Sequence, residues 1–135
     1  LNAHGLQIKS YWEGEESVCR FTPATYHTAV PGFVYGGLIA SVMDCHGTGT
    51  AAAAAYRAAG RPMGTGEDFR FVTASLHVDY LKPTPIDAPL EVRGKVVEIK
   101  ARKVVVHMTL LVNDQVCARG EITAVRLTES FGKRS

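Results

Sequence analysis

The chain has 135 residues, of which 46% are hydrophobic and 21% charged, a composition typical of one folded globular domain over residues 1–135. Its formal net charge of +2 is too small, and its basic residues too scattered, to indicate a nucleic-acid partner. No apolar run reaches the roughly 20 residues that span a bilayer, because Asp44, His46 and Arg57 interrupt the best candidate.

The cysteines and the N-terminal end bear on localisation and on metal binding. Cys19, Cys45 and Cys117 are odd in number and show neither a CxxC spacing nor a neighbouring histidine cluster. The sequence starts at Leu1 rather than Met and shows no signal-peptide pattern. We therefore predict a protein of the reducing cytoplasm that needs no metal and no cofactor.

The first third of the chain predicts two short strands and an irregular segment. Loose alternation favours strands over residues 5–11 and 17–21, with a hairpin turn at residues 14–16. Residues 22–33 contain two prolines and form an irregular connection to the next element. His27 lies in that segment, and we interpret it as a surface loop histidine because its spacing pairs it with no nucleophile.

A long helix is the strongest element that the sequence predicts. No proline interrupts the chain between Gly36 and Gly60, and Pro62 comes shortly after the second glycine. Small residues fill the second half of this stretch, so other elements could pack closely around it. Gly47 and Gly49 each cost about 1 kcal/mol of helix stability relative to alanine, which favours interpreting both as packing positions against a sheet.

Two features of this helix point to chemistry. Asp44 is a carboxylate within the apolar part, where a charge is rarely placed without a partner or a purpose. Gly36 and Gly37 begin the helix, where unpaired backbone N–H groups and the positive end of the helix dipole could stabilise an oxyanion. Together they suggest acyl transfer, with Asp44 as general base or nucleophile.

The spacing of these residues implies more than one subunit. Eight residues separate Gly36 from Asp44, which is roughly 12 Å along a helix axis. One substrate carbonyl cannot contact both. The hypothesis therefore requires a homodimer in which antiparallel helices complete two shared sites across a two-fold axis.

After the helix the sequence predicts a loop and then four strands. Residues 61–72 are polar and rich in glycine, and could form either a lid over a pocket or an ordinary excursion. Residues 73–81 alternate cleanly, with Ala74, Leu76, Val78 and Tyr80 on the apolar side. Strands at 90–99, 103–112 and 116–127 come next, with turns at residues 100–102 and 113–114. The pattern is that of an α+β domain.

These motifs resemble a known family. The run YGG at 35–37, Asp44, and TASLHVDYLKP at 73–83 resemble the hotdog-fold acyl-CoA thioesterases of the phenylacetate-pathway (PaaI) type, over about residues 6–127. The resemblance implies one long central helix enclosed by an antiparallel sheet, and dimers that join edge to edge and often pair into homotetramers. It also implies an oxyanion-hole N–H at Gly36, an acting Asp44 from the partner subunit, and Thr73 as the residue that positions water.

Two positions depart from the family pattern. Tyr35 stands where the family has histidine, and Ala29 stands where many members have asparagine. These losses motivate an alternative function, a binding or sensing protein for acyl thioesters that has lost turnover. A dehydratase or isomerase is disfavoured because no histidine shares a helix face with Asp44.

Further residues are candidates for contact with an acyl-CoA substrate. Tyr35 could donate to a bound carbonyl or pack at a subunit seam, Phe33 could line the acyl pocket, and His46 is a weaker candidate. Cys45 is more simply an inert core thiol than a nucleophile. The basic turn, defined as Lys100, Arg102 and Lys103, is either a solvated tip or, as the resemblance implies, a clamp for the phosphates of coenzyme A.

Overall fold

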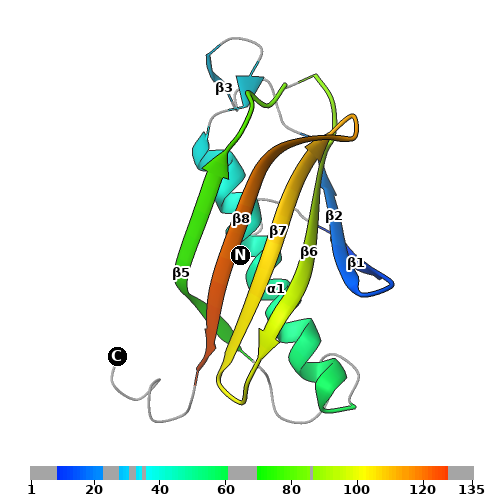
Figure 1. Cartoon of the computed structure of the whole chain (residues 1–135), viewed down its shortest axis with the longest axis vertical. Coiled ribbons are helices and arrows are strands. Elements are labelled where there is room, and N and C mark those ends of the chain that lie inside the picture. Colours follow the sequence, from blue (N-terminus) through cyan, green and yellow to red (C-terminus); the bar gives the residue numbers. More distant parts are fainter. Residues whose placement is uncertain are drawn as a thin grey trace.

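The structure is a computed structural model that describes residues 9–22, 28–30, 33–34, 36–60, 70–85 and 87–127. A single long helix, α1 (Gly36–Ala58), packs against one face of a six-stranded antiparallel sheet (Figure 1). The strands lie across the sheet in the order β1 (Lys9–Glu13), β2 (Glu16–Phe21), β6 (Leu90–Ile99), β7 (Lys103–Val112), β8 (Gln115–Arg126) and β5 (Phe71–Tyr80). This is the hotdog arrangement that the resemblance implied.

A second, two-stranded sheet precedes the helix. It consists of β3 (Thr28–Val30) and β4 (Phe33–Val34), a pairing that the sequence did not predict in a segment expected to be irregular. The Val34 N–H donates to the Thr84 carbonyl at 2.8 Å, which ties this segment to the chain just after β5. Within the described ranges, the structure contains no helix whose length and hydropathy would allow it to span a bilayer.

The meander from β6 to β8 agrees closely with the sequence prediction. The strands at 90–99 and 103–112 have the predicted bounds, and the last strand is shifted by one residue at each end. Asn113 and Asp114 form the turn between β7 and β8 with φ angles of 51° and 65°. Two consecutive positive φ angles are the geometry of a two-residue type I′ hairpin turn, for which Asn and Asp are suited.

The core lies between α1 and the inner face of the sheet. Leu38, Val42 and Met43 of the helix are buried against inward-facing residues of β6, β7 and β8. Gly47 is also buried, and a Cβ there would lie 2.6 Å from Ile122 Cγ2, so this glycine is a packing position as predicted. The same prediction for Gly49 is wrong: Gly49 is exposed, and a Cβ would meet nothing within 4 Å. The two positions are about 200° apart around the helix, so only one can face the sheet.

Strand β5 is an edge of the sheet and is less buried than its alternation predicted. Leu76 and Val78 pack against the core, whereas Ala74 and Tyr80 are exposed. The pairing of β5 with β8 shifts register between Thr73 and Ser75, and this bulge breaks the single alternating phase. Among the described residues no strand pairs with the outer edge of β5.

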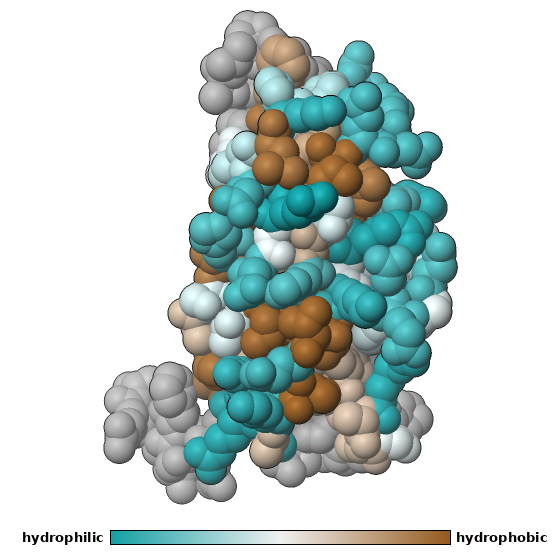
Figure 2. Space-filling model, in the orientation of Figure 1, coloured by the Kyte–Doolittle hydropathy of each residue, from teal (hydrophilic) through white to brown (hydrophobic). Residues whose placement is uncertain are grey.

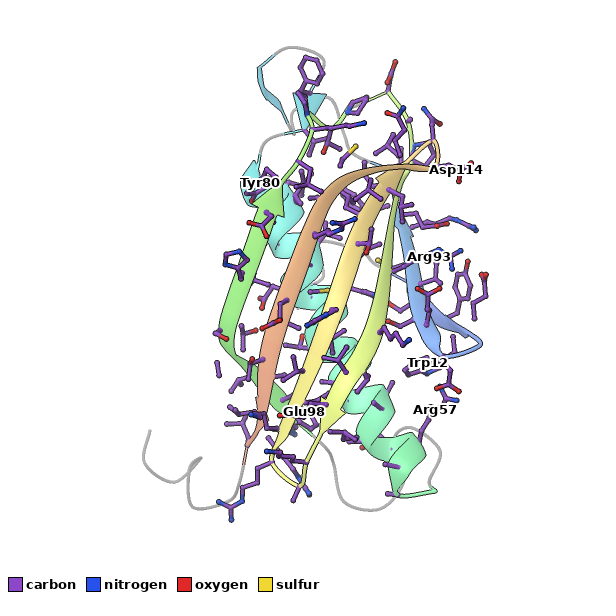
Figure 3. The ribbon with its side chains drawn as sticks, in the orientation of Figure 1. Trp12, Arg57, Tyr80, Arg93, Glu98 and Asp114 are labelled. Atoms are coloured by element: carbon purple, nitrogen blue, oxygen red, sulfur yellow. The ribbon has the colours of Figure 1, made fainter. Side chains whose placement is uncertain are left out.

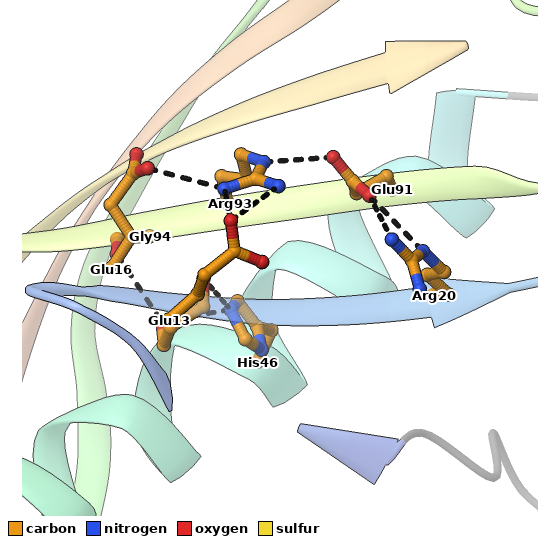
Figure 4. A network of polar contacts seen from close by, with 8 residues as sticks. Glu13, Glu16, Arg20, His46, Glu91, Arg93 and Gly94 are labelled. Carbon is orange, nitrogen blue, oxygen red and sulfur yellow. Dashed lines mark hydrogen bonds and ion pairs between the residues drawn. The ribbon is translucent and has the colours of Figure 1, made fainter. Parts of the chain in front are cut away.

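The outer face of the sheet, turned away from α1, carries a mixed surface. Figure 2 shows this face, with hydrophilic and apolar side chains interspersed. Arg93 there contacts Glu13, Glu16 and Glu91, and Arg20 also contacts Glu91 (Figure 4). These ion pairs tie β1, β2 and β6 together on the solvent side.

Candidate active site

Asp44 and Thr73 meet where the helix crosses the edge strand. Asp44 projects from the middle of α1 and is half-buried, and Thr73 lies at the bulge of β5. The Thr73 hydroxyl donates a hydrogen bond to Asp44 Oδ1. This bond fixes one carboxylate oxygen and leaves the other able to act on a ligand. The sequence named both residues, and the fold brings them together across 29 positions of the chain.

Gly36 begins the helix next to the opposite end of β5. The Tyr80 hydroxyl donates to the Gly36 carbonyl at 2.7 Å, and its ring lies against the glycine (Figure 3). A Cβ at Gly36 would lie 3.2 Å from Tyr80 Cζ and 3.3 Å from Cε1 and the hydroxyl oxygen. Glycine therefore allows the tyrosine to pack on the helix start. Sequence reasoning placed Tyr80 on the apolar side of its strand and missed this contact.

The two halves of the expected chemistry are separate within one chain. Helix α1 is continuous from Gly36 to Ala58, so the roughly 12 Å rise between Gly36 and Asp44 holds in the folded protein. Each lies at the edge of the sheet formed by β5, Gly36 beside Tyr80 and Asp44 beside Thr73. A carbonyl held at one of these places is out of reach of the other.

A hollow of about 210 Å³ adjoins Gly36. Val34 and Ile39 contribute apolar wall, Leu81 and Lys82 are exposed at the rim, and Thr84 is buried. Phe33 is 40% exposed and is not among the residues that line this hollow. Tyr35 and the side chain of Ala29 lie outside the described residues, as do His27 and the expected lid loop at 61–69.

His46 is placed differently from the expectation that it contacts substrate. It is 1% exposed, with Nδ1 2.9 Å from Ser10 Oγ and Nε2 3.0 Å from Ser17 Oγ. Burial lowers the pKa of His46, which favours the neutral ring. Gly94 makes room for this cluster, since a Cβ there would lie 2.7 Å from Ser17 Oγ. His46 joins the helix to β1 and β2, and it does not belong to the site around Asp44.

Cys45 does not offer a nucleophile. It is half-buried, and burial raises the pKa of its thiol above the ordinary value, with the neighbouring Asp44 adding to the increase. Thiolate is the reactive form of cysteine, so a raised pKa leaves less of this form at neutral pH.

The basic turn lies at the other end of the sheet from Gly36 within the chain (Figure 1). Across the sheet, Tyr80 of β5 pairs with Ala118 of β8, and Ala118 pairs with Leu110 of β7. Lys103 is the first residue of β7, seven residues before Leu110. Seven residues of strand correspond to about 23 Å. Lys103 Nζ lies 2.9 Å from Glu98 Oε2 and Lys100 Nζ lies 4.0 Å from it, contacts that lower the pKa of Glu98. The turn could reach the helix start only of another subunit.

The described residues contain no group of three or more His, Cys, Asp or Glu side chains placed to hold a metal ion. What the geometry offers is a carboxylate with a hydroxyl partner, a glycine helix start, and a hollow beside it. One helix packed on an antiparallel sheet, with these features along the edge strand, defines a protein of the hotdog class.

Comparison with known proteins identifies the family. The family model described as the thioesterase superfamily matches residues 31–119, and the chain belongs to that superfamily. A thioesterase superfamily protein from Shewanella loihica PV-4 is 50% identical in sequence, with a TM-score of 0.75 over 95% of this chain and 96% of that one. The E. coli PaaI protein is 14% identical, and it shares the fold with a TM-score of 0.73 over 91% of this chain and 81% of its own.

Among curated proteins, the acyl-coenzyme A thioesterase THEM4 of Xenopus laevis is 33% identical over 108 residues. That match covers 80% of this chain and 43% of the relative. The chain therefore spans less than half the length of this curated relative.

Proposed function

We propose that this chain hydrolyses an acyl-CoA thioester. The observation that carries the proposal is the hydrogen bond from Thr73 to Asp44, which orients a half-buried carboxylate at the edge of the sheet in a member of the thioesterase superfamily. Gly36 supplies a backbone N–H at the helix start for the oxyanion, and Gly37 is the neighbouring donor.

A homodimer joined through β5 accounts for the separation of these groups. If two copies of β5 pair antiparallel about a two-fold axis near residues 76 and 77, Thr73 of one copy faces Tyr80 of the other. Asp44 beside Thr73 then approaches Gly36 of the partner subunit. The ten-residue β5 offers an outer edge that has no strand beside it among the described residues, which supports this pairing. Further pairing of dimers into tetramers is part of the expectation from the family.

The chemistry divides between the two subunits. Gly36 N–H polarises the thioester carbonyl, and Asp44 of the other subunit either takes a proton from water or attacks the carbonyl carbon itself. In the first case the water oxygen forms the new bond to carbon, the C–S bond breaks, and the thiolate of coenzyme A receives the proton. In the second case the Asp44 carboxylate bonds to the carbonyl carbon as the C–S bond breaks, which gives an anhydride. Water then splits the anhydride, returning the Asp44 carboxylate and passing its proton to the coenzyme A thiolate. Thr73 holds Asp44 and helps to position the water.

Hydrolysis of short, medium, long and aromatic acyl-CoAs tests the proposal. We expect Asp44→Ala to lower kcat by about 10²–10⁴-fold, the range for removal of a general base, while substrate still binds. Asp79→Ala is the matched control, because Asp79 is an exposed carboxylate of β5 paired with His77. Equal turnover in both variants would refute the role of Asp44.

Mixed dimers test the sharing of sites. Asp44→Ala and Gly36→Pro should each be inactive alone, since proline suits the first helical position but removes the N–H. Its Cβ also presses on Tyr80, so Gly36→Ala, which adds the same Cβ and keeps the N–H, is the control. After the two are unfolded and refolded together, each mixed dimer keeps one intact site, so random pairing should restore roughly a quarter of the wild-type activity. No recovery from folded, mixed dimers would contradict the shared site.

Acyl-thioester binding without turnover is the second candidate, favoured by Tyr35 and Ala29 in place of the family's polar residues. It predicts that no acyl-CoA is hydrolysed while acyl-CoA still binds. Asp44→Ala would then change stability more than ligand binding.

A further inference from the structure

Tyr80 ends strand β5 against the start of helix α1. Its hydroxyl donates to the Gly36 carbonyl at 2.7 Å, a contact between residues 44 positions apart (Figure 3). The ring packs closely as well, since a Cβ at Gly36 would lie 3.2 Å from Tyr80 Cζ. Tyr80 is 52% exposed, so burial of its ring does not explain the contact. What the contact does is join the edge strand to the glycine helix start.

Neither partner requires this hydrogen bond for its own satisfaction. Gly36 is the first residue of α1, and its carbonyl accepts from the N–H four residues later, as in any α-helix. The exposed Tyr80 hydroxyl could bond water instead at a similar free energy. The bond from Tyr80 therefore occupies the second lone pair of the carbonyl. Its effect is to fix the orientation of Gly36.

A helix start made of glycines has little orientation of its own. Gly36 and Gly37 have no Cβ, so their φ and ψ angles are restricted less than those of other residues. The first N–H groups of a helix have no partner within it, and helix ends fray. An oxyanion hole is effective only when its donors already point at the oxygen. These two glycines therefore need support from another element to act as donors.

The backbone of Tyr80 is held firmly enough to give that support. Tyr80 pairs with Ala118 of β8, which is fully buried. Directly after Tyr80, the N–H groups of Leu81 and Lys82 both donate to the Cys117 carbonyl, at 2.9 Å and 3.1 Å. A side chain on a fixed strand orients its partner more precisely than one on a loop.

We propose that Tyr80 is a positioning residue for the oxyanion donors at Gly36 and Gly37. This inference rests on the proposed acyl-CoA function. The peptide unit that joins the two glycines is planar, so a bond to the Gly36 carbonyl also orients the Gly37 N–H. A hydrogen bond accepted by a carbonyl polarises its peptide unit and strengthens the N–H of that unit as a donor. The Gly36 N–H is oriented because it belongs to the residue that Tyr80 holds.

Ser41 offers a matched comparison one peptide unit further along the helix. Its hydroxyl donates to the Gly37 carbonyl at 2.9 Å, so it acts on the unit that carries the Leu38 N–H. Ser41 belongs to α1 itself and lies four residues after Gly37, so its bond does not tie the helix start to the sheet. The proposal therefore predicts that catalysis depends on the hydroxyl of Tyr80 and not on that of Ser41.

Hydrolysis of acyl-CoA by Tyr80→Phe and Ser41→Ala tests this role. Phenylalanine keeps the ring against Gly36 and removes only the hydroxyl. Tyr80→Phe should lower kcat by about 3–10-fold, the loss expected for one hydrogen bond between neutral groups. Its KM should be unchanged, because aligned donors act mainly on the transition state. Ser41→Ala should keep the kcat of wild type. A raised KM with the kcat of wild type would overturn the proposal, since Tyr80 would then bind substrate directly.

The infrared stretch of a bound carbonyl gives a readout that does not depend on turnover. The probe is a ketone analogue of acyl-CoA with a methylene in place of the sulfur and ¹³C at the carbonyl, which cannot be hydrolysed. Less aligned donors polarise this carbonyl less. The stretching frequency in Tyr80→Phe should therefore lie between that of wild type and that of Gly36→Pro, which lacks the N–H. A merely structural role for Tyr80 predicts a lower unfolding midpoint and an unchanged frequency.

The outcomes separate this proposal from the proposed hydrolysis. If wild type hydrolyses no ester but binds the ketone with a lower frequency than Tyr80→Phe does, hydrolysis fails and the positioning role stands. If wild type hydrolyses acyl-CoA while kcat and frequency are the same in Tyr80→Phe, hydrolysis stands and the positioning role is refuted. Failure of wild type to bind the ketone would also refute the positioning role.

Discussion

Replacing Gly47 and Gly49 separately by alanine tests how the helix packs on the sheet. Both lie inside α1, two residues apart, so alanine brings the same gain of about 1 kcal/mol in helix propensity at each. They differ in surroundings. At Gly47 the new Cβ would lie 2.6 Å from Ile122 Cγ2, 3.1 Å from its Cδ1 and 3.3 Å from Met108 Cε, and at Gly49 it would meet nothing within 4 Å.

The difference between the two variants isolates the cost of the contact. Ordinary van der Waals contact begins near 3.4 Å, so the Gly47 methyl would be 0.8 Å too close to Ile122. Ile122 is fully buried and β-branched, so its Cγ2 cannot swing aside freely. Overpacking of this kind costs about 1–3 kcal/mol. Gly49→Ala should therefore be about 1 kcal/mol more stable than wild type, and Gly47→Ala about 1–3 kcal/mol less stable than Gly49→Ala.

Urea unfolding at a fixed protein concentration measures both values, since association would add a concentration dependence. An Ile122→Ala change in the Gly47→Ala background should recover part of the loss, as a coupling energy in a double-mutant cycle. Equal stability of the two alanine variants would show that α1 does not approach β8 as described.

Three further predictions concern stability. Burial lowers the pKa of His46 below its unfolded value of 6.5. The contribution of neutral His46 to the free energy of unfolding is therefore complete above pH 6.5 and is lost as the pH falls through the folded pKa. Urea unfolding at a series of pH values should show this loss of stability in wild type and in the control His107→Gln, where the histidine is exposed. His46→Gln should not show it. Asp114→Val should be less stable than Asp114→Gly by about 1–2 kcal/mol in the free energy of unfolding, the cost of a left-handed conformation for an L-residue with φ of 65°. The thermal midpoint of Asp114→Val should be correspondingly lower, and equal midpoints would contradict this. Arg57→Ala should lower the free energy of unfolding by about 0.5–1 kcal/mol, because it removes the guanidinium 4.3 Å from the Trp12 ring centroid. Tryptophan fluorescence monitors the unfolding, and an unchanged unfolding midpoint would show that the contact is not stabilising.

The sequence by itself determined the elements and much of their order. Residues 90–99 and 103–112 are rich in β-branched valine, and Asn113 and Asp114 tolerate the positive φ of a tight turn, so local preferences agree with the fold. The stretch from Gly36 has no proline before Gly60, which leaves a helix as the favoured structure. Helix geometry also determined that Gly36 and Asp44 are too far apart to share one carbonyl.

Tertiary structure alone decided which side chains meet. Gly47 and Gly49 look alike in sequence, and only the direction in which α1 faces the sheet makes one a packing position and the other solvent-exposed. His46 is similar, since Ser10 and Ser17 come from strands that a sequence pattern cannot align with the helix. Local patterns report periodicity and backbone preference, whereas contacts between distant residues depend on how elements are packed.

The edge strand β5 shows the same difference between what the sequence and what the tertiary structure determine, here at the candidate site. Alternation predicted β5 and placed Tyr80 on the same side as Leu76 and Val78, and the structure keeps that phase because the bulge lies before Leu76. The bulge changes only the side of Thr73, which meets Asp44, while Tyr80 packs on Gly36; these contacts span 29 and 44 positions of the chain. Sequence supplied the chemistry-bearing residues, and the packing of α1 across β5 decided their partners because no local preference acts over such separations.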